Sequence, residues 1–374
     1  MNPQDIFCPN IDCPARGQTG KGNIGIHSQK DQRYKCDVCQ QTFTTTKGTI
    51  FYRLRTNPVT VMIVITLLAY GCPIQAVVKA FGLDERTICD WQARAGQHCQ
   101  QVHEHLVESS QHDLGQVQAD EIKVKIQKGT IWMALAIWVP TRLWMGGVIS
   151  PKRNLDLIQA LADKVRKMAL CRPLLLAVDG LVSYVSAFRN AFRSKFPRQE
   201  GELGRCKMVS WQDIAIVQVV KQRVEGVLNV ERRIVQGAKD RVERLIKTTQ
   251  GKGVINTAFI ERLNATFRQR INPLTRRTRT LAQRAETLLA GMYIVGCFYN
   301  FCDFHHSLRL KLFVGSFGHH WVQRTPAIAA GVTNHQWTPT ELLNFKVPPP
   351  RWELPKQRGR PSTAALQMAQ QWAS

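Results

Sequence analysis

The chain has 374 residues and a formal net charge of +24, because 51 lysine and arginine residues outnumber 27 aspartate and glutamate residues. Its composition, 44% hydrophobic and 21% charged, is that of a globular protein and excludes a disordered basic tail as the source of the charge. At roughly 100 to 200 residues per domain, the chain has room for two or three domains. We therefore expect folded domains that bind a polyanionic partner.

Apolar runs in the sequence are all shorter than the stretch of about 18 residues that a membrane span needs. The longest, residues 59–70, has only the length of an ordinary helix. The opening residues Met-Asn-Pro-Gln-Asp lack the basic start and apolar core of a secretory signal. We expect a cytoplasmic protein with no membrane partner.

Four of the eleven cysteines lie within the first 39 residues, as the pairs Cys8-x4-Cys13 and Cys36-x2-Cys39. In a chain without an export signal, clustered cysteines indicate a metal site rather than disulfides. Four thiolates can bind one tetrahedral Zn²⁺, which replaces the core that so short a segment cannot build. We predict a zinc ribbon over residues 1–52; the alternative is four unrelated thiols.

Residues 57–108 have the pattern of three helices. An apolar run over residues 60–70 and a shorter one over residues 74–81 both end at a glycine, and Asp84 can cap a third helix. Helix, tight glycine turn, helix is the pattern of a helix-turn-helix domain. A three-helix spacer without DNA contacts is the alternative. If the third helix enters a major groove, two of its polar positions can contact DNA: Arg86 and Arg94.

The period of apolar residues changes from helical to alternating in the region over residues 114–302. Three antiparallel strands, helix, strand, helix is the order of a ribonuclease-H-like fold. We therefore predict an α/β domain with a mixed five-stranded sheet. The expected elements are strands over residues 117–126, 130–139 and 142–149, a helix over 154–168, a strand over 173–180, a helix over about 183–196 and a strand over 214–220.

One stretch in the later part of the chain carries a large share of the excess positive charge. Residues 205–279 hold 17 basic and 6 acidic residues, so this stretch is the strongest candidate for binding the phosphates of a nucleic acid. Residues 221–290 are predicted to be helical, and a solvated helical face is the alternative explanation for their charge. We expect residues 303–374 to form an irregular extension with a basic tail.

Three carboxylates are predicted to meet in the sheet region. Asp120 lies in the first predicted strand, Asp179 ends the fourth, and Glu261 lies in a helix predicted over residues 256–270. In a ribonuclease-H-like sheet, the first two positions point to one spot, and a later helix can add a third carboxylate. Carboxylates bind Mg²⁺, and a pair of such ions about 4 Å apart can stabilise both oxygens of an in-line phosphodiester displacement.

Each of these acidic residues also has an ordinary interpretation as a turn residue, an exposed strand residue or a surface charge on a helix. On the predicted helix, Asn264 and Arg268 share a face with Glu261, and an amide and a guanidinium beside a carboxylate suit a metal and a phosphate. Alternation along the strand is expected to aim Glu121, the neighbour of Asp120, at the opposite face.

The acidic motifs resemble those of the DDE transposases of bacterial insertion sequences. The segment around Glu261 is the most specific, and the N-terminal modules are similar to the branch in which a zinc ribbon and a helix-turn-helix precede the catalytic domain. The matching segments are Ala119-Asp120-Glu121, Ala177-Val178-Asp179-Gly180, Asn256 through Arg268, Asn300-Phe301-Cys302 and Arg324 through Gly331.

The resemblance implies that Asp120, Asp179 and Glu261 bind Mg²⁺ or Mn²⁺. It implies cleavage at the ends of a DNA element followed by strand transfer by a 3′-hydroxyl, with element ends and target as double-stranded DNA partners. It further implies a homo-oligomer on DNA at the bacterial nucleoid. A DNA-binding regulator, a nuclease of the same fold without strand transfer and a degenerate, inactive copy remain alternatives.

Two features depart from the family's pattern or lie outside it. The Cys8-x4-Cys13 pair is wider than a usual knuckle, and basic residues around 217–249 form extra material between Asp179 and Glu261, which we interpret as an insertion that contacts DNA. In the tail, Arg358-Gly359-Arg360-Pro361 resembles the core of an AT-hook, whose two arginines enter a narrow minor groove. A disordered basic end is the alternative for the tail.

Overall fold

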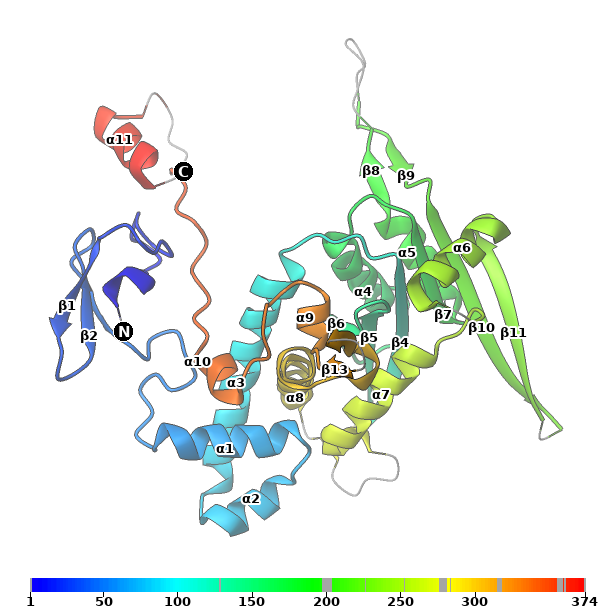
Figure 1. The fold of residues 1–374 in the computed structure, drawn as a ribbon, viewed down its shortest axis with the longest axis horizontal. Helices are drawn as coiled ribbons and strands as arrows, with labels where there is room; N and C mark the ends of the chain where they lie inside the picture. Colours follow the sequence, from blue (N-terminus) through cyan, green and yellow to red (C-terminus); the bar gives the residue numbers. More distant parts are fainter. Residues whose placement is uncertain are drawn as a thin grey trace. The chain divides into compact units, whose positions relative to one another are not determined.

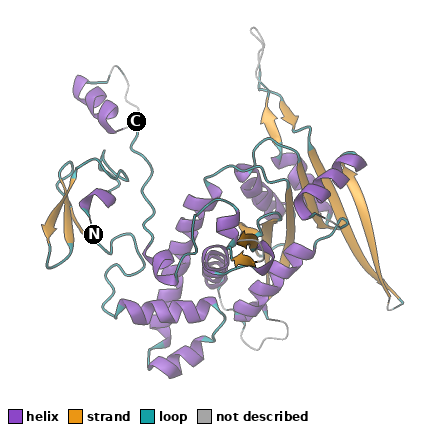
Figure 2. Cartoon of the chain, in the orientation of Figure 1, coloured by secondary structure: helices purple, strands orange, loops and turns teal. Residues whose placement is uncertain are grey.

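The computed structural model describes residues 2–127, 129–196, 204–225, 227–251, 253–275, 281–282, 284–314, 318–354, 359 and 361–372. The chain divides into two compact units. The first combines Met1–Val61 with Leu343–Ser374, and the second is Met62–Leu342. The second unit contains both helices and strands and has a mixed α/β architecture (Figure 2).

The first unit is a small antiparallel sheet that carries the paired cysteines. Its strands are β1 (Ile24–Ser28), β2 (Arg33–Cys36) and β3 (Thr42–Thr44), preceded by a short 3₁₀ turn at Pro3–Asp5. The C-terminal helix α11 (Thr363–Trp372) belongs to the same unit.

Chain segments from both ends complete the core of the first unit. Trp372 is buried in one cluster with Cys8, Cys13 and Cys36, and its carbonyl accepts a hydrogen bond of 2.6 Å from Gln18. The Arg16 guanidinium donates to the carbonyls of residues 350 and 351 at 2.7 and 3.2 Å. The last helix therefore supplies apolar cover that a three-stranded sheet of this size lacks.

Three helices follow, as the sequence predicted: α1 (Pro58–Ala69), α2 (Ile74–Phe81) and α3 (Glu85–His103). Gly82 ends α2 in the left-handed region with φ of 63°. Asp84 caps α3 by accepting from the backbone N–H groups of residues 86 and 87. Ile88 and Trp91 are buried, as expected. A π turn at Glu104–Glu108 extends α3.

The second unit is built on a mixed sheet, six-stranded in the described part of the chain, with the order β11-β10-β7-β4-β5-β6. β4, β5 and β6 are antiparallel neighbours, β7 is parallel to β4, β10 is parallel to β7, and β11 is antiparallel to β10. The bounds are β4 (Gln116–Ile126), β5 (Gly129–Trp138), β6 (Leu143–Ser150), α4 (Leu155–Met168), β7 (Leu174–Asp179), α5 (Val182–Ala191), β10 (Ile214–Val224) and β11 (Val227–Gln236).

The sheet differs from the expected five strands because β10 runs four residues past the predicted end and pairs with β11 as a long hairpin (Figure 1). The prediction that residues 221–290 are helical is wrong at its start. Most of β11 is exposed on both faces, so its sequence lacks the apolar alternation of a half-buried strand. Helices resume with α6 (Lys239–Gln250), α7 (Ala258–Arg270) and α8 (Ala285–Cys297), with a 3₁₀ turn at Asn272–Leu274.

Two further hairpins lie outside the main sheet. The helix expected to reach residue 196 ends at Ala191 and is followed by β8 (Arg193–Lys195), which pairs with β9 (Met208–Ser210). The segment after residue 303, expected to be irregular, contains a second hairpin and short helices. These are a 3₁₀ turn at His306–Leu308, β12 (Leu310–Val314), β13 (Gly318–Val322), α9 (Pro326–Ala329) and α10 (Pro339–Asn344).

One helical stretch of the described residues, Ala285–Leu308, is long and apolar enough to cross a membrane. Its apolar window is 72% buried inside the fold, as in the core helix of a globular protein. Gly296 of this stretch packs directly under Trp144, where an added Cβ would lie 2.1 Å from the indole ring.

Candidate functional site

The register of β4 and β7 brings two of the predicted carboxylates together. Gln118 of β4 lies opposite Ala177 of the parallel strand β7. Two residues further along both strands come Asp120 and Asp179, so the two carboxylates lie side by side where β7 ends. This placement follows from strand pairing alone, and it is the meeting point that the sequence predicted.

Helix α7 is fixed to β4 by Gln118, a residue that the sequence analysis did not identify. The Gln118 Oε1 atom accepts hydrogen bonds of 3.1 Å from the backbone N–H groups of both Phe259 and Ile260, and its Nε2 donates to the Asn256 carbonyl at 2.8 Å. Gln118 thus satisfies N–H groups in the first turn of α7 that no helix carbonyl can reach. These hydrogen bonds fix the position of Glu261, the residue after Ile260.

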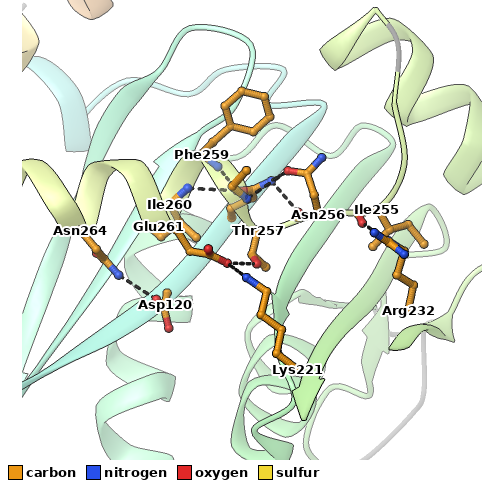
Figure 3. A network of polar contacts seen from close by, with 12 residues as sticks. Asp120, Lys221, Arg232, Ile255, Asn256, Thr257, Phe259, Ile260, Glu261 and Asn264 are labelled. Atoms are coloured by element: carbon orange, nitrogen blue, oxygen red, sulfur yellow. Dashed lines mark hydrogen bonds and ion pairs between the residues drawn. The ribbon is translucent and has the colours of Figure 1, made fainter. Parts of the chain in front are cut away.

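Asn264, one turn after Glu261, joins α7 to the strand carboxylate. It is fully buried, and its Nδ2 donates to Asp120 Oδ2 at 2.8 Å (Figure 3). Because Gln118 and Asp120 both contact α7, this helix covers the face of β4 that bears alternate residues 118 and 120. The sequence placed Asn264 beside Glu261 as a residue that orients this glutamate or holds a phosphate, whereas in the structure its amide donates to Asp120.

The three predicted carboxylates line one pocket of about 770 Å³. Asp120 comes from β4, Asp179 from the end of β7 and Glu261 from α7, so residues far apart in sequence converge there. The pocket wall is also basic, because it includes Arg153, Lys221 and Arg268. Arg268 was predicted for this site, whereas the other two basic residues were not.

Glu121 also belongs to the acidic cluster, which corrects the expectation that it lies away from it. Strand alternation does turn Glu121 toward α5, where the buried Tyr184 hydroxyl donates to its Oε2 at 2.7 Å. Its carboxylate nevertheless joins Asp120 and Asp179 in a group whose potential ligand atoms all lie within 4.8 Å of one another. Glu261 is outside that group, although it lines the same pocket.

Two basic side chains pair with these carboxylates. Arg153, in the link between β6 and α4, forms an ion pair with Glu121 and a second one of 3.2 Å with Asp179 Oδ2. Lys221 of β10 forms an ion pair with Glu261, which also accepts a hydrogen bond of 2.5 Å from the Thr257 hydroxyl (Figure 3).

Burial and crowding of like charges perturb the acidic residues. Burial raises the pKa of Asp120 to about 7, with further contributions from Glu121, Asp179 and Glu261. Burial also raises the pKa of Glu121. Burial acts in the same direction on Glu261, but the hydrogen bonds from Lys221 and Thr257 lower its pKa overall. The negative charge of Asp120 is therefore poorly compensated in this pocket.

The donor set of this pocket fits a hard divalent cation. Carboxylate oxygens are the ligands that Mg²⁺ and Mn²⁺ prefer, and the clustered oxygens of Asp120, Glu121 and Asp179 can share one ion. A divalent cation would favour the ionised form of Asp120 and so oppose the raised pKa that burial causes. Asp120 and Asp179 are thus placed to hold such an ion, and Glu261 of α7 lines the same pocket.

The four N-terminal cysteines converge on a second candidate metal site. Their sulfur atoms lie within 4.8 Å of one another, with 3.7 Å between Cys8 and Cys39 and 3.8 Å between Cys13 and Cys36. A tetrahedral Zn²⁺ with Zn–S bonds of about 2.3 Å separates its sulfurs by about 3.8 Å. The four donors therefore fit zinc, and the wide Cys8-x4-Cys13 spacing is no obstacle.

The buried thiols need a cation to ionise. Burial raises the pKa of Cys13 to about 12 and raises that of Cys8 further. Because zinc binds thiolates, a bound ion would offset this cost and tie the strands and loops of the first unit together. The alternative of four unrelated thiols is wrong for the described geometry, since all four sulfurs share one place.

The predicted DNA contacts outside the pocket fall on different parts of the chain. Arg86 and Arg94 are both exposed on α3, with Arg86 in its first turn. Arg358 and Arg360 of the possible AT-hook lie outside the described residues. The basic stretch around residues 217–249 forms the β10–β11 hairpin and α6.

Comparison with known proteins adds no family to this description. No family model matches the chain, and no curated protein matches it.

We predict that Cys36→Ser abolishes stoichiometric zinc binding, because three thiolates leave the tetrahedral site incomplete.

Trp372→Ala is expected to retain zinc but release it faster to a chromogenic chelator, because the Trp372 indole packs against the cysteine cluster. Trp321→Ala, a substitution in β13, is the matched control. Equal zinc content in wild type and Cys36→Ser, or equal release from Trp372→Ala and the control, would contradict these assignments.

We predict that Asp120→Asn stabilises the protein without divalent cations. Because the folded-state pKa of Asp120 is raised to about 7, the folded chain binds more protons than the unfolded chain, and stability falls as pH rises from about 4 to 7. At pH 8 the free energy of unfolding of the Asp120→Asn variant should therefore exceed that of wild type by roughly 2 to 4 kcal/mol.

Chemical denaturation with and without Mn²⁺ measures both halves of this prediction. Mn²⁺ should stabilise wild type and the control variant Asp163→Asn, whose carboxylate is exposed on α4, but should have little effect on Asp120→Asn. A metal-free Asp120→Asn protein that is less stable than wild type at pH 8 would show that the charge at this position is already compensated.

Proposed function

We propose that the protein is a metal-dependent DNA transposase that cleaves phosphodiesters at the ends of a DNA element and joins them to a target. The observation that carries the proposal is the convergence of Asp120, Asp179 and Glu261, from two strands and a helix, on one pocket with a basic wall. The zinc-binding cysteine cluster and the net charge of +24 support a nucleic-acid partner.

Strand order supports a ribonuclease-H-like assignment for the sheet. If β4 is counted as the first strand, the order across the sheet is 3-2-1-4-5, with the first three strands antiparallel and the next two parallel to the first. Along the chain, β4 to β6, α4, β7 and α5 follow one another in the order expected from the sequence, and β11 adds a sixth strand at the edge of the sheet. On this assignment the acidic residues occupy the positions at which such a fold gathers its carboxylates.

In the proposed reaction, Asp120, Asp179 and Glu261 would hold the catalytic cations. Divalent ions held there would activate the oxygen of water or of a 3′-hydroxyl for attack and would stabilise the charge that develops on the leaving oxygen. Gln118 and Asn264 hold α7 against β4, so that Glu261 faces the strand carboxylates. The oxygens of the scissile phosphate then face the basic wall.

DNA recognition is assigned to the elements before the sheet. Helices α1 to α3 form a helix-turn-helix in this proposal, and Arg86 and Arg94 contact the element ends. The basic residues of β10, β11 and α6 contribute affinity that depends on salt but not on sequence. The oligomer on DNA and the location at the nucleoid belong to the same proposal.

A nuclease of the same fold would use the same pocket and the same cations, so strand transfer is the property that separates the two functions. A regulator that only binds DNA accounts for the basic charge but not for the acidic cluster, since clustered carboxylates weaken attraction to phosphates. The acidic pocket therefore favours an enzyme.

We predict that Asp120→Asn and Glu261→Gln each reduce DNA cleavage by several orders of magnitude, because each removes a charge that attracts the catalytic cation. DNA binding should persist or tighten, since a negative charge near the phosphates is lost. A supercoiled plasmid that carries the element's ends, incubated with Mg²⁺, measures cleavage and strand transfer together.

Asp163→Asn is the control for this assay, because the exposed carboxylate on α4 does not line the pocket. Glu121→Gln cannot serve as a control, since its carboxylate lies in the acidic cluster. Normal cleavage by the Asp120→Asn protein would refute the proposed active site, and cleavage without joined products would favour the nuclease.

A further inference from the structure

Arg153 and Lys221 form ion pairs with carboxylates that the proposed catalysis requires for metal binding. Arg153 bridges Glu121 and Asp179, and Lys221 forms an ion pair with Glu261 in the same pocket. The two side chains come from different elements, the β6–α4 link and β10. Each neutralises an acidic residue that would otherwise face like charges without compensation.

The geometry leaves these ion pairs open to exchange. The Asp179 and Glu261 side chains are 34% and 44% exposed, and those of Arg153 and Lys221 are 36% and 42% exposed. Ion pairs with this much solvent access gain little free energy, so a divalent cation on the same oxygens can replace them. By contrast, the Glu121 side chain is 1% exposed, and its pairing with Arg153 cannot be replaced by water.

We propose that Arg153 and Lys221 are internal counter-ions that compete with the catalytic divalent cation for Asp179 and Glu261. When the cation binds, Arg153 releases Asp179 but stays on the buried Glu121, which keeps its guanidinium beside the pocket. Lys221 releases Glu261, which is then able to approach Asp120 and Asp179. This inference rests on the proposed metal-dependent function and describes how its site passes from the metal-free to the metal-bound form.

The same exchange prepares the pocket for DNA. A guanidinium released from Asp179 and an ammonium released from Glu261 both remain on the pocket wall, where they can donate to phosphate oxygens. Cation binding thus converts two side chains that neutralise the protein's own acids into two phosphate donors. Glu121, through Arg153, acts as a positioning residue in this scheme.

Mn²⁺ binding to the zinc-loaded full-length chain, measured without DNA by electron paramagnetic resonance of the free ion, tests the competition. Loading the cysteine cluster with zinc first confines Mn²⁺ to the acidic pocket. Arg153→Gln and Lys221→Gln should each bind Mn²⁺ roughly tenfold more tightly, because one competing positive charge is removed near the ion. Arg153→Lys keeps the charge and should stay close to wild type.

Lys167→Gln is the matched control, since it removes one exposed positive charge on α4 that does not line the pocket. If Arg153→Gln and Lys221→Gln bind Mn²⁺ no more tightly than this control, while Asp120→Asn abolishes binding, the counter-ion proposal is wrong and the metal site stands. If neither wild type nor any variant binds Mn²⁺ in a manner that depends on Asp120, the proposed metal-dependent function fails as well.

Thermal unfolding of the same samples separates competition from a purely structural role. Without Mn²⁺, Arg153→Gln should melt below wild type, because the buried Glu121 loses a charged partner. Saturating Mn²⁺ should narrow that difference, since the variant gains more from the ion than wild type does. A difference in melting temperature that Mn²⁺ leaves unchanged would show that Arg153 only supports the fold.

Discussion

The concentration of negative charge in one pocket of a strongly basic chain is the constraint on which the site depends. Four carboxylates, from Asp120, Glu121, Asp179 and Glu261, lie in or beside a pocket of a protein with a net charge of +24. Such a cluster requires cations, because crowded carboxylates in a partly buried site cannot all ionise alone. Two basic side chains supply part of this charge, and a divalent ion would supply the rest.

Helix α7 is held at both ends, which gives the pocket a defined geometry. At its start, Gln118 binds two backbone N–H groups, and at its end Arg270 forms an ion pair of 2.5 Å with Asp303. Asp303 also accepts a hydrogen bond of 2.6 Å from Tyr70, the residue that follows α1. Asp303 therefore connects the end of the helix that carries Glu261 to the end of α1, in the helical segment proposed to read DNA.

Much of the fold and the three acidic positions followed from the sequence because their signals are local. Glycine turns and the Asp84 cap defined α2 and α3, alternation defined β4, and β-branched and aromatic runs defined β5 and β6. The exposed strand β11 gave no such signal. Gln118 and Glu121 were missed because their importance depends on neighbours from other elements, although a glutamine in an apolar strand, two residues before Asp120, was a usable hint. The contact of Trp372 with the cysteine cluster joins opposite ends of the chain and leaves no local pattern.

Anomalous scattering from crystals of the zinc-loaded chain soaked in Mn²⁺ tests the central claim most directly, because it locates the ion and its neighbours together. The account predicts a manganese peak between the carboxylates of Asp120 and Asp179, with Arg153 still on Glu121 but no longer on Asp179. A peak elsewhere, or no peak in the pocket while Arg153 keeps both of its ion pairs, would contradict the claim that this acidic cluster is a metal-dependent active site.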